Sequence, residues 1–211
     1  MKKVLVFGAS GGTGKLVVQQ ALEAGHHVTI VLRNPDAFTL QHPHLEIIKG
    51  NVFQQHSFEK AIKGKDVVIS CLGIQKREPT TVYSEGVGNI MKAMQQENVN
   101  RIICLSAGAV IVPPNSSFTM KFITKNILQR LFRYSYADML LMEKIISASN
   151  LNWTIIRPPW LRNSKYTGKY RTSINGHLNR PSKISRADLA HYIVNHLADE
   201  DTFKSTIELS Y

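Results

Sequence analysis

The sequence predicts an α/β fold, in which a doubly wound and mostly parallel sheet carries helices on both faces. Short apolar runs rich in Val and Ile alternate with helical patterns from one end of the chain to the other. These runs are continuous, as is typical of strands buried on both faces of a parallel sheet. A length of 211 residues suits one domain with a substantial core. We therefore expect a three-layer αβα domain over residues 1–211.

The expected strands and helices alternate in chain order. Apolar runs predict six strands and a final edge strand, at residues 3–8, 27–32, 45–49, 66–71, 101–105, 152–156 and 206–209. Helical spacing and terminal glycines predict helices at residues 12–24, 81–97, 117–133, 136–148 and 186–197. Between the sixth strand and the last helix, residues 158–185 are expected to form a small C-terminal part that covers the substrate.

The chain is strongly basic, and the excess is uneven. Its 26 Lys and Arg residues stand against 15 acidic residues, which gives a net charge of +11. Residues 98–137 hold five basic residues and no acidic one, and residues 161–186 hold seven and none. Such a concentration of positive charge can attract an anionic small ligand, a nucleic acid or an anionic membrane surface. Alternatively, these basic residues only form a solvated face of the protein. Because the patterns of nucleic-acid modules are absent, nucleic acid is not expected, and neither is a membrane surface.

Cysteine usage and hydropathy predict a cytoplasmic protein. Cys71 and Cys104 are the only cysteines, and both lie in apolar, strand-like runs. Two such thiols make no disulfide framework or zinc cluster, which favours a reducing compartment. The apolar run before Gly8 has only four residues, Val4 to Phe7, which is too few for a signal peptide, and no run approaches the roughly 18 residues needed to span a bilayer.

The motif GASGGTGK at residues 8–15 follows the first strand and opens the first helix. A P-loop requires G-x-x-x-x-G-K-[ST], which would place a glycine at position 9 and a hydroxyl at position 16. The chain has Ala9 and Leu16 there, so both tests fail. The glycines at 8, 11 and 14 instead fit the turn of a Rossmann-like dinucleotide-binding unit, which seats a pyrophosphate on the helix N-terminus.

The end of the second strand indicates the form of the cofactor. A carboxylate at this point binds the ribose 2′-hydroxyl of NAD, whereas arginine suits the 2′-phosphate of NADP. Here the strand ends in Leu32, Arg33 and Asn34, and Asp36 lies too far into the loop to hold the ribose. The pattern therefore favours NADP(H), with a solvated arginine at a strand end as the alternative.

Motifs along nearly the whole chain resemble those of the atypical short-chain dehydrogenase/reductases. On the NmrA-like side of that superfamily, the chain looks most like the biliverdin-IXβ reductase and flavin reductase group. The segments that carry the resemblance are GASGGTG (8–14), VTIVLRN (28–34), GNV (50–52), CLG (71–73), PTTVYSEGVGNI (79–90), ICLSAG (103–108), RPPW (157–160), TGKY (167–170) and ISRADLAHYI (184–193).

The resemblance implies a cofactor site at the carboxyl ends of the strands. Arg33 would bind the 2′-phosphate, and Asn51 and Val52 would border the adenine, where the family usually has aspartate before the hydrophobic residue. Ser106 would reach the nicotinamide carboxamide or the substrate and is the candidate catalytic residue. No metal is expected. The implied cofactor-binding residues are Gly8, Ser10, Gly11, Gly12, Thr13, Gly14, Arg33, Asn51, Val52, Leu72, Gly73, Ser106, Pro158, Pro159 and Trp160.

The usual acid of the superfamily, a tyrosine followed four residues later by lysine, is absent from the sequence. Tyr134 and Tyr136 are followed at that spacing by Asp138 and Leu140. The biliverdin and flavin reductase group also lacks the pair, and solvent or substrate supplies the proton there. The resemblance thus implies hydride transfer without a strong protein acid.

Other candidate segments have both a functional and a structural interpretation. Ser106 could donate to the substrate or only contact the cofactor. Glu143 and Lys144 could place an ionisable group near the site or lie on a solvated helix face. Residues 116–136 form an apolar stripe flanked by basic residues, which predicts a helix packed on the domain, as a lid or otherwise, or one that lies on a membrane.

Two functions fit these features. The first is an NADPH-dependent reductase that transfers hydride to a flat, conjugated, anionic acceptor, such as a flavin, a bilin or a quinone-like compound. The second is a non-catalytic NADP(H)-binding sensor or regulatory protein of the NmrA type, since a fold alone does not establish a reaction. We expect the partner to be a small-molecule acceptor and the chain to be a monomer or a weak homodimer.

Overall fold

An eight-stranded sheet forms the middle layer of the protein, as shown by a computed structural model that describes residues 1–74, 77–112 and 118–211. The strand order is β3-β2-β1-β4-β5-β6-β10-β8, and each neighbouring pair is parallel except β10 and β8. The strands of this sheet are β1 (Lys3–Phe7), β2 (His27–Leu32), β3 (Leu45–Lys49), β4 (Val67–Ser70), β5 (Arg101–Leu105), β6 (Asn152–Arg157), β8 (Arg171–Ile174) and β10 (Ser205–Ser210).

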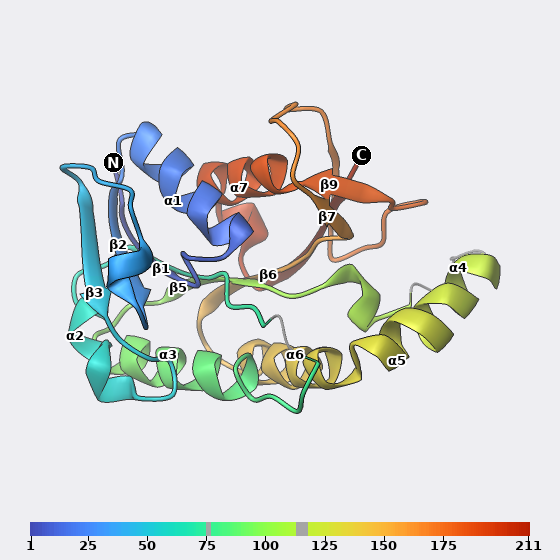
Figure 1. Ribbon diagram of the computed structural model, residues 1–211, viewed down its shortest axis with the longest axis horizontal. Coiled ribbons are helices and arrows are strands. Elements are labelled where there is room, and N and C mark those ends of the chain that lie inside the picture. The colour runs from blue at the N-terminus through green and yellow to red at the C-terminus, as the bar shows by residue number, and fades with distance from the viewer. Residues whose placement is uncertain (75–76, 113–117) are drawn as a thin grey trace.

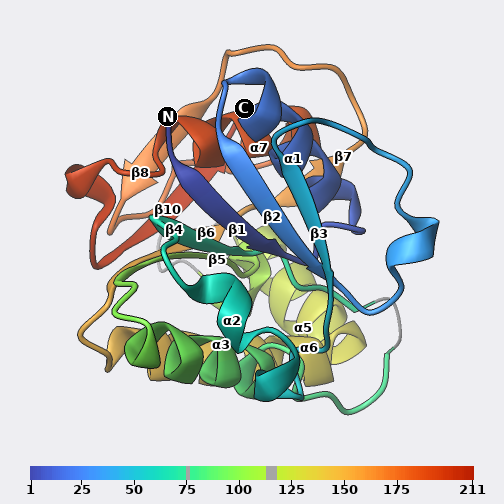
Figure 2. The same ribbon diagram turned by 90° about the vertical axis from the view of Figure 1, so that its left-hand side faces the viewer.

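Helices cover both faces of the sheet, with α1 and α7 on one face and α2, α3 and α6 on the other (Figures 1 and 2). The predicted three-layer, doubly wound α/β fold is therefore confirmed. The described helices are α1 (Gly12–Glu23), α2 (Glu59–Ile62), α3 (Ser84–Gln96), α4 (Phe118–Ile123), α5 (Gln129–Leu131), α6 (Arg133–Ser147) and α7 (Arg186–Asn195), and a π-helical turn (Thr124–Leu128) joins α4 to α5.

The first strand shows why continuous apolar runs predict this layering. Val4 and Val6 pack in the core beneath α1 and α7, whereas Leu5 and Phe7 pack in the opposite core with α3 and α6. All four side chains are fully buried. Because successive side chains of a strand point to opposite faces of the sheet, an uninterrupted apolar run supplies both cores at once.

The strand order reverses between β1 and β4, and this reversal positions the candidate site. β1 pairs with β2 on one side and with β4 on the other. In open α/β sheets, the connections that leave two such strands diverge, so a crevice opens at their carboxyl ends. The glycine turn follows β1 at this point, and Cys71, Leu72 and Gly73 follow β4.

The C-terminal strands differ from the prediction. The predicted edge strand at 206–209 is an inner strand, because β10 lies between β6 and β8. β8 is the true edge, paired antiparallel to β10 with Ile174 opposite Ile207. A separate two-stranded parallel sheet, β7 (Trp160–Arg162) with β9 (Lys183–Ser185), lies within the segment 158–185. These three strands are only three or four residues long, and none has more than two apolar residues, so they leave no recognisable apolar run in the sequence.

The segment predicted as one helix over residues 117–133 is helical from Phe118 in the described part of the chain, and residues 113–117 lie outside it. α4 extends away from the body of the protein (Figure 1). The side chains of Phe118, Phe122 and Ile127 are 85%, 55% and 51% exposed. The expectation that this apolar stripe packs on the domain is therefore wrong for these residues. Within the described ranges, no helix is long and apolar enough to cross a membrane.

Candidate functional site

The glycine turn between β1 and α1 has a conformation that only glycine allows at two of its positions. Gly8 has φ +76°, and a Cβ there would lie 2.3 Å from the carbonyl oxygen of Cys71. A Cβ on Gly14 would lie 2.2 Å from the carbonyl oxygen of Gly8. The N–H of Gly11 donates to that same oxygen at 3.0 Å and closes the turn. These contacts match the tight turn and close helix–strand packing that dinucleotide-binding glycines provide.

The N-terminus of α1 is open toward the crevice. Gly11 is its N-cap and makes no side-chain capping bond, and no acidic residue lies in the first turn. Gly11 and Gly12 are exposed, as is Ser10, whereas Thr13 is buried. The first N–H groups of a helix have no intrahelical acceptor and carry a partial positive charge. The turn can therefore bind a pyrophosphate through its backbone.

The residues expected around the adenosine follow β2 and β3. Arg33 is exposed directly after β2. Val52 is buried beside α3 and comes within 3.1 Å of the position of a Cβ on Gly86. The side-chain carbonyl of Asn51, a residue expected to border the adenine, already accepts from the N–H of Phe53 at 3.2 Å. An amide oxygen can accept twice, so a bond to the adenine stays available.

Ser106 lies beside the end of β6, because the segments that follow β5 and β6 stay hydrogen-bonded to each other. The N–H of Ser106 donates to the carbonyl of Ile156 at 2.8 Å, and the N–H of Gly108 donates to that of Pro158 at 2.8 Å. Ser106 is 6% exposed, and among the described residues its Oγ is the one buried side-chain polar atom without a hydrogen-bond partner. An unpaired buried hydroxyl costs about 1–3 kcal/mol, so the Ser106 hydroxyl is available to bond to a ligand or to a water molecule.

The remaining residues expected to bind the cofactor differ in exposure. Pro158 is buried and Pro159 is half-buried. Trp160 begins β7, and its side chain is 66% exposed. Leu72 is half-buried and Gly73 is exposed, with open space where a Cβ would stand. The large ring of Trp160 is thus free to contact a ligand, and it contributes little to the core.

Asp138, which stands four residues after Tyr134, has a structural role. Its carboxylate accepts from the N–H of Tyr83 at 2.9 Å, from the N–H of Ser84 at 3.3 Å and from the Ser84 hydroxyl. These bonds satisfy the N-terminus of α3. Burial raises the pKa of Tyr136 and disfavours its ionised form. Asp138 is therefore engaged with α3, and the hydroxyl of Tyr134 accepts a hydrogen bond from Arg133.

Glu143, the other ionisable candidate on α6, is held in an ion pair with Arg157 at the end of β6. Lys144 beside it is exposed. Burial raises the pKa of the Cys71 thiol to about 12 and raises that of Cys104, so both thiols stay protonated and have little nucleophilic character. Within the described ranges, no three His, Cys, Asp or Glu side chains are grouped to hold a metal ion.

Asp188, in the first turn of α7, is a buried carboxylate that the sequence did not single out. It accepts from the hydroxyls of Ser185 and Tyr211, from the N–H and hydroxyl of Thr167, and from the N–H of Gly168, at 2.5–2.9 Å. Burial alone would raise its pKa, but these hydrogen bonds outweigh burial and lower the pKa to about 2. The carboxylate thereby ties the TGKY segment and the C-terminus to α7. The S-x-x-D spacing of an N-cap was the available signal.

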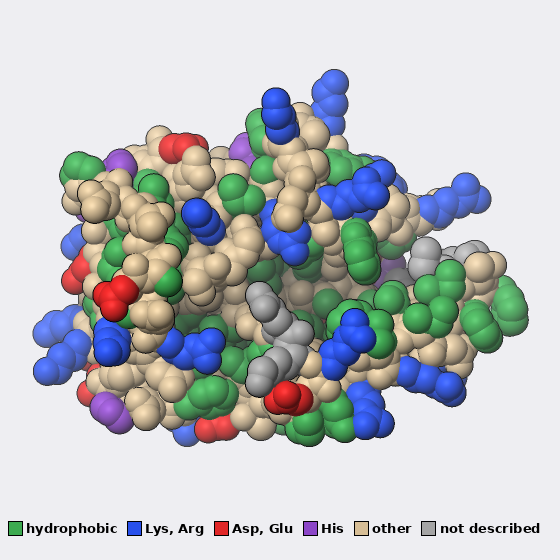
Figure 3. Space-filling view, viewed as in Figure 1, with side chains coloured by type: hydrophobic (Ala, Val, Ile, Leu, Met, Phe, Trp, Pro, Cys, Tyr) green, Lys and Arg blue, Asp and Glu red, His purple; other side chains and the backbone are tan. Residues whose placement is uncertain are grey.

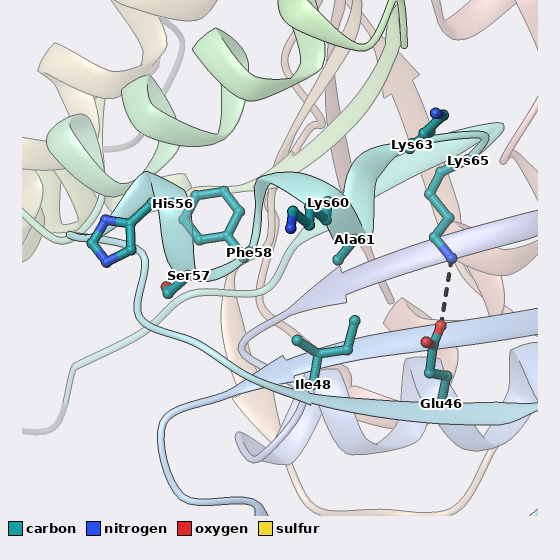
Figure 4. A pocket seen from close by; sticks show the side chains of 9 residues that line it. All are labelled: Glu46, Ile48, His56, Ser57, Phe58, Lys60, Ala61, Lys63 and Lys65. Carbon is teal, nitrogen blue, oxygen red and sulfur yellow. Dashed lines mark ion pairs between the residues drawn. The ribbon is translucent and has the colours of Figure 1, made fainter.

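A cavity of about 540 Å³ lies away from the glycine turn, against the edge strand β3 (Figure 4). Lys65 crosses one end of it and pairs with Glu46 at 3.8 Å. None of its lining residues belongs to the predicted site, so we do not assign the cofactor to it. The lining residues are Glu46, Ile48, His56, Ser57, Phe58, Lys60, Ala61, Lys63 and Lys65.

Comparisons with known proteins agree with this geometry. A sequence profile of a family described as NAD(P)H-binding matches residues 8–200. A chloroplastic protein of Arabidopsis thaliana, of uncharacterised function, is 27% identical over 99% of this chain and 76% of its own length.

Solved structures show the same fold. A short-chain dehydrogenase/reductase of Veillonella parvula in complex with NADP superposes with a TM-score of 0.81 at 20% identity, over 100% of this chain and 94% of that one. A candidate NADH-flavin reductase of Streptococcus pneumoniae superposes with a TM-score of 0.80 at 23% identity, over 100% of this chain and 99% of that one. The expected likeness to the short-chain dehydrogenase/reductase fold is therefore confirmed.

Proposed function

We propose that this chain, which belongs to the NAD(P)H-binding family, is an NADPH-dependent reductase that transfers hydride to a flat, conjugated, anionic acceptor. The observation that carries the proposal is the unpaired, buried hydroxyl of Ser106, a residue whose N–H donates to the carbonyl of Ile156 in β6. It lies at the carboxyl end of β5, where open α/β sheets bind their ligands. A cofactor bound on the glycine turn supplies the hydride.

The choice of NADPH rests on the end of β2. Arg33 is exposed there, and the nearest carboxylate along the loop, Asp36, lies in a separate short helical turn. An arginine fork matches a phosphate in both charge and geometry, whereas NAD would call for a carboxylate against the ribose. The Veillonella protein of the same fold binds NADP, which agrees with this choice.

The residues of this chain orient the reactants and supply no strong acid. Ser106 would donate a hydrogen bond to the nicotinamide carboxamide or to the acceptor. Asp138 is engaged at the N-terminus of α3, and Glu143 is engaged with Arg157. An acceptor that takes hydride at carbon or nitrogen, with its proton from solvent, suits such a site. Positioning is then the main contribution of the protein.

The charge pattern favours an anionic acceptor. Seven basic residues and no acidic one lie between residues 161 and 186, which lead from β7 to the start of α7. Figure 3 shows a hollowed face with Lys and Arg side chains on several sides of the hollow. A concave, positively charged surface raises the local concentration of anionic ligands. The phosphates of flavin nucleotides and the propionates of bilins are negatively charged groups of this kind.

The test is NADPH oxidation, followed by absorbance, with FMN, FAD, biliverdin and a set of quinones. Reactions without protein give the background rate, because free acceptors also oxidise NADPH slowly. We expect turnover with at least one acceptor and a preference for NADPH over NADH. Tight NADPH binding without turnover on any acceptor would refute the reductase and favour the non-catalytic sensor.

A further inference from the structure

Arg186 lies against the glycine turn although it is far from it in the sequence. It is the first residue of α7, and Gly12 is the first residue of α1. Its Nε and Cδ lie 3.0 and 3.1 Å from the position that a Cβ on Gly12 would take, and its Cζ lies 3.8 Å away. The two helices pack side by side on one face of the sheet (Figures 1 and 2). The guanidinium therefore stands beside the open N-terminus of α1.

The charge of Arg186 is not neutralised by the protein. Its Nη1 donates to the side-chain oxygen of Asn163 at 2.8 Å, and in the described part of the chain no carboxylate pairs with it. The closest acid along the helix, Asp188, is already engaged by five other hydrogen-bond donors. A half-buried guanidinium with donors to spare is suited to an anionic ligand.

From this placement we infer that Arg186 binds the pyrophosphate of the dinucleotide, together with the N-terminus of α1. The pyrophosphate carries two negative charges, and the guanidinium fork can bind it at two points. Asn163 follows β7, so its bond to Arg186 also connects the segment that carries Trp160 to the glycine turn. The inference rests on the dinucleotide binding in the proposed function, but it does not require turnover.

This assignment separates the two arginines by the phosphate they hold. Arg33 would bind the 2′-phosphate, which only NADP(H) carries, whereas Arg186 would bind the pyrophosphate, which NADPH, NADH and ADP-ribose share. Adenosine 2′-monophosphate has the 2′-phosphate and no pyrophosphate. These four ligands therefore distinguish a pyrophosphate contact from a general loss of positive charge.

The experiment is titration calorimetry of the full chain with the four ligands, for wild type, Arg186→Ala and Arg186→Lys. The matched control, Arg130→Ala, removes one exposed charge on α5. We expect Arg186→Ala to weaken the binding of NADPH, NADH and ADP-ribose by a common factor of about 10 to 100. Adenosine 2′-monophosphate should bind with unchanged affinity. Arg186→Lys should recover part of the lost affinity, and Arg130→Ala should leave the affinity for all four ligands unchanged.

Three outcomes would overturn the assignment. Unchanged affinity of Arg186→Ala for NADPH, with wild type binding normally, would remove Arg186 from the site and leave the proposed function standing. If the affinity for adenosine 2′-monophosphate fell by the same factor, the effect would come from a general loss of positive charge or from a contact with the 2′-phosphate. A wild-type chain that binds none of the four ligands would refute the proposed function as well. Unfolding curves of the free variants serve to show that Arg186→Ala still folds.

Discussion

Arg157 and Glu143 form a two-point ion pair, with Nε 3.0 Å from Oε1 and Nη2 2.5 Å from Oε2. Their side chains are only 14% and 8% exposed. Arg157 is the last residue of β6 and directly precedes Pro158. The pair thus anchors α6 to the strand end from which the chain enters the candidate site.

Removing one partner of this pair should destabilise the protein strongly. Glu143→Ala leaves the Arg157 guanidinium buried and uncompensated, which we expect to lower the free energy of unfolding by about 3 kcal/mol. Chemical denaturation measures the change, and Lys144→Ala, an exposed site on the same helix, is the control. The double replacement Glu143→Leu with Arg157→Met should recover most of the loss. This account would be contradicted if Glu143→Ala lowered the free energy of unfolding no more than Lys144→Ala does.

Ser106→Ala should separate stability from function. Because the Ser106 hydroxyl has no partner in the protein, its removal should leave the free energy of unfolding unchanged or raise it by up to about 1 kcal/mol. NADPH affinity or turnover should fall by about tenfold if the hydroxyl bonds to the cofactor or acceptor. Ser185→Ala is the matched contrast, since its hydroxyl caps α7, and it should cost about 1 kcal/mol. Loss of stability in Ser106→Ala without a functional change would argue for a packing role.

Arg33→Ala should change the cofactor preference. It removes the expected contact with the 2′-phosphate, so the dissociation constant for NADPH should rise by about 10- to 100-fold. Affinity for NADH should hardly change, because NADH lacks that phosphate. Binding titrations with both cofactors measure the ratio. Equal losses for the two would mean that Arg33 does not hold the 2′-phosphate.

Asp188 should make the stability depend on pH in an acidic window. Its folded-state pKa of about 2 lies below the unfolded value of about 3.9. The ionised carboxylate therefore stabilises the fold above about pH 4, and this contribution is lost as the pH falls toward about 2. The difference in unfolding free energy between wild type and Asp188→Asn should shrink across that window. A difference that stays constant from neutral to acidic pH would count against the role of the ionised carboxylate.

The fold and the glycine turn could be predicted because their signals are local. A continuous apolar run such as Val4 to Phe7 predicts a strand buried on both faces without knowledge of its neighbours. The glycines at 8, 11 and 14 predict a turn by their spacing between a strand and a helix, and the structure shows that a side chain at 8 or 14 would collide with the carbonyl oxygen of Cys71 or Gly8. Ser106 was a candidate through the resemblance to a family, and neither that resemblance nor the local sequence predicted that its hydroxyl has no partner.

The sequence by itself determined the α/β layering, the dinucleotide turn and the arginine after β2, since each depends on residues close together in the chain. Only the tertiary structure decided which distant groups meet. It placed Arg186 beside Gly12, paired Glu143 with Arg157, surrounded Asp188 with donors and left the side chains of Phe118 and Phe122 on α4 exposed. The physical reason is that the partner of a charged or apolar side chain depends on how elements pack, and residue type and spacing do not encode that choice locally.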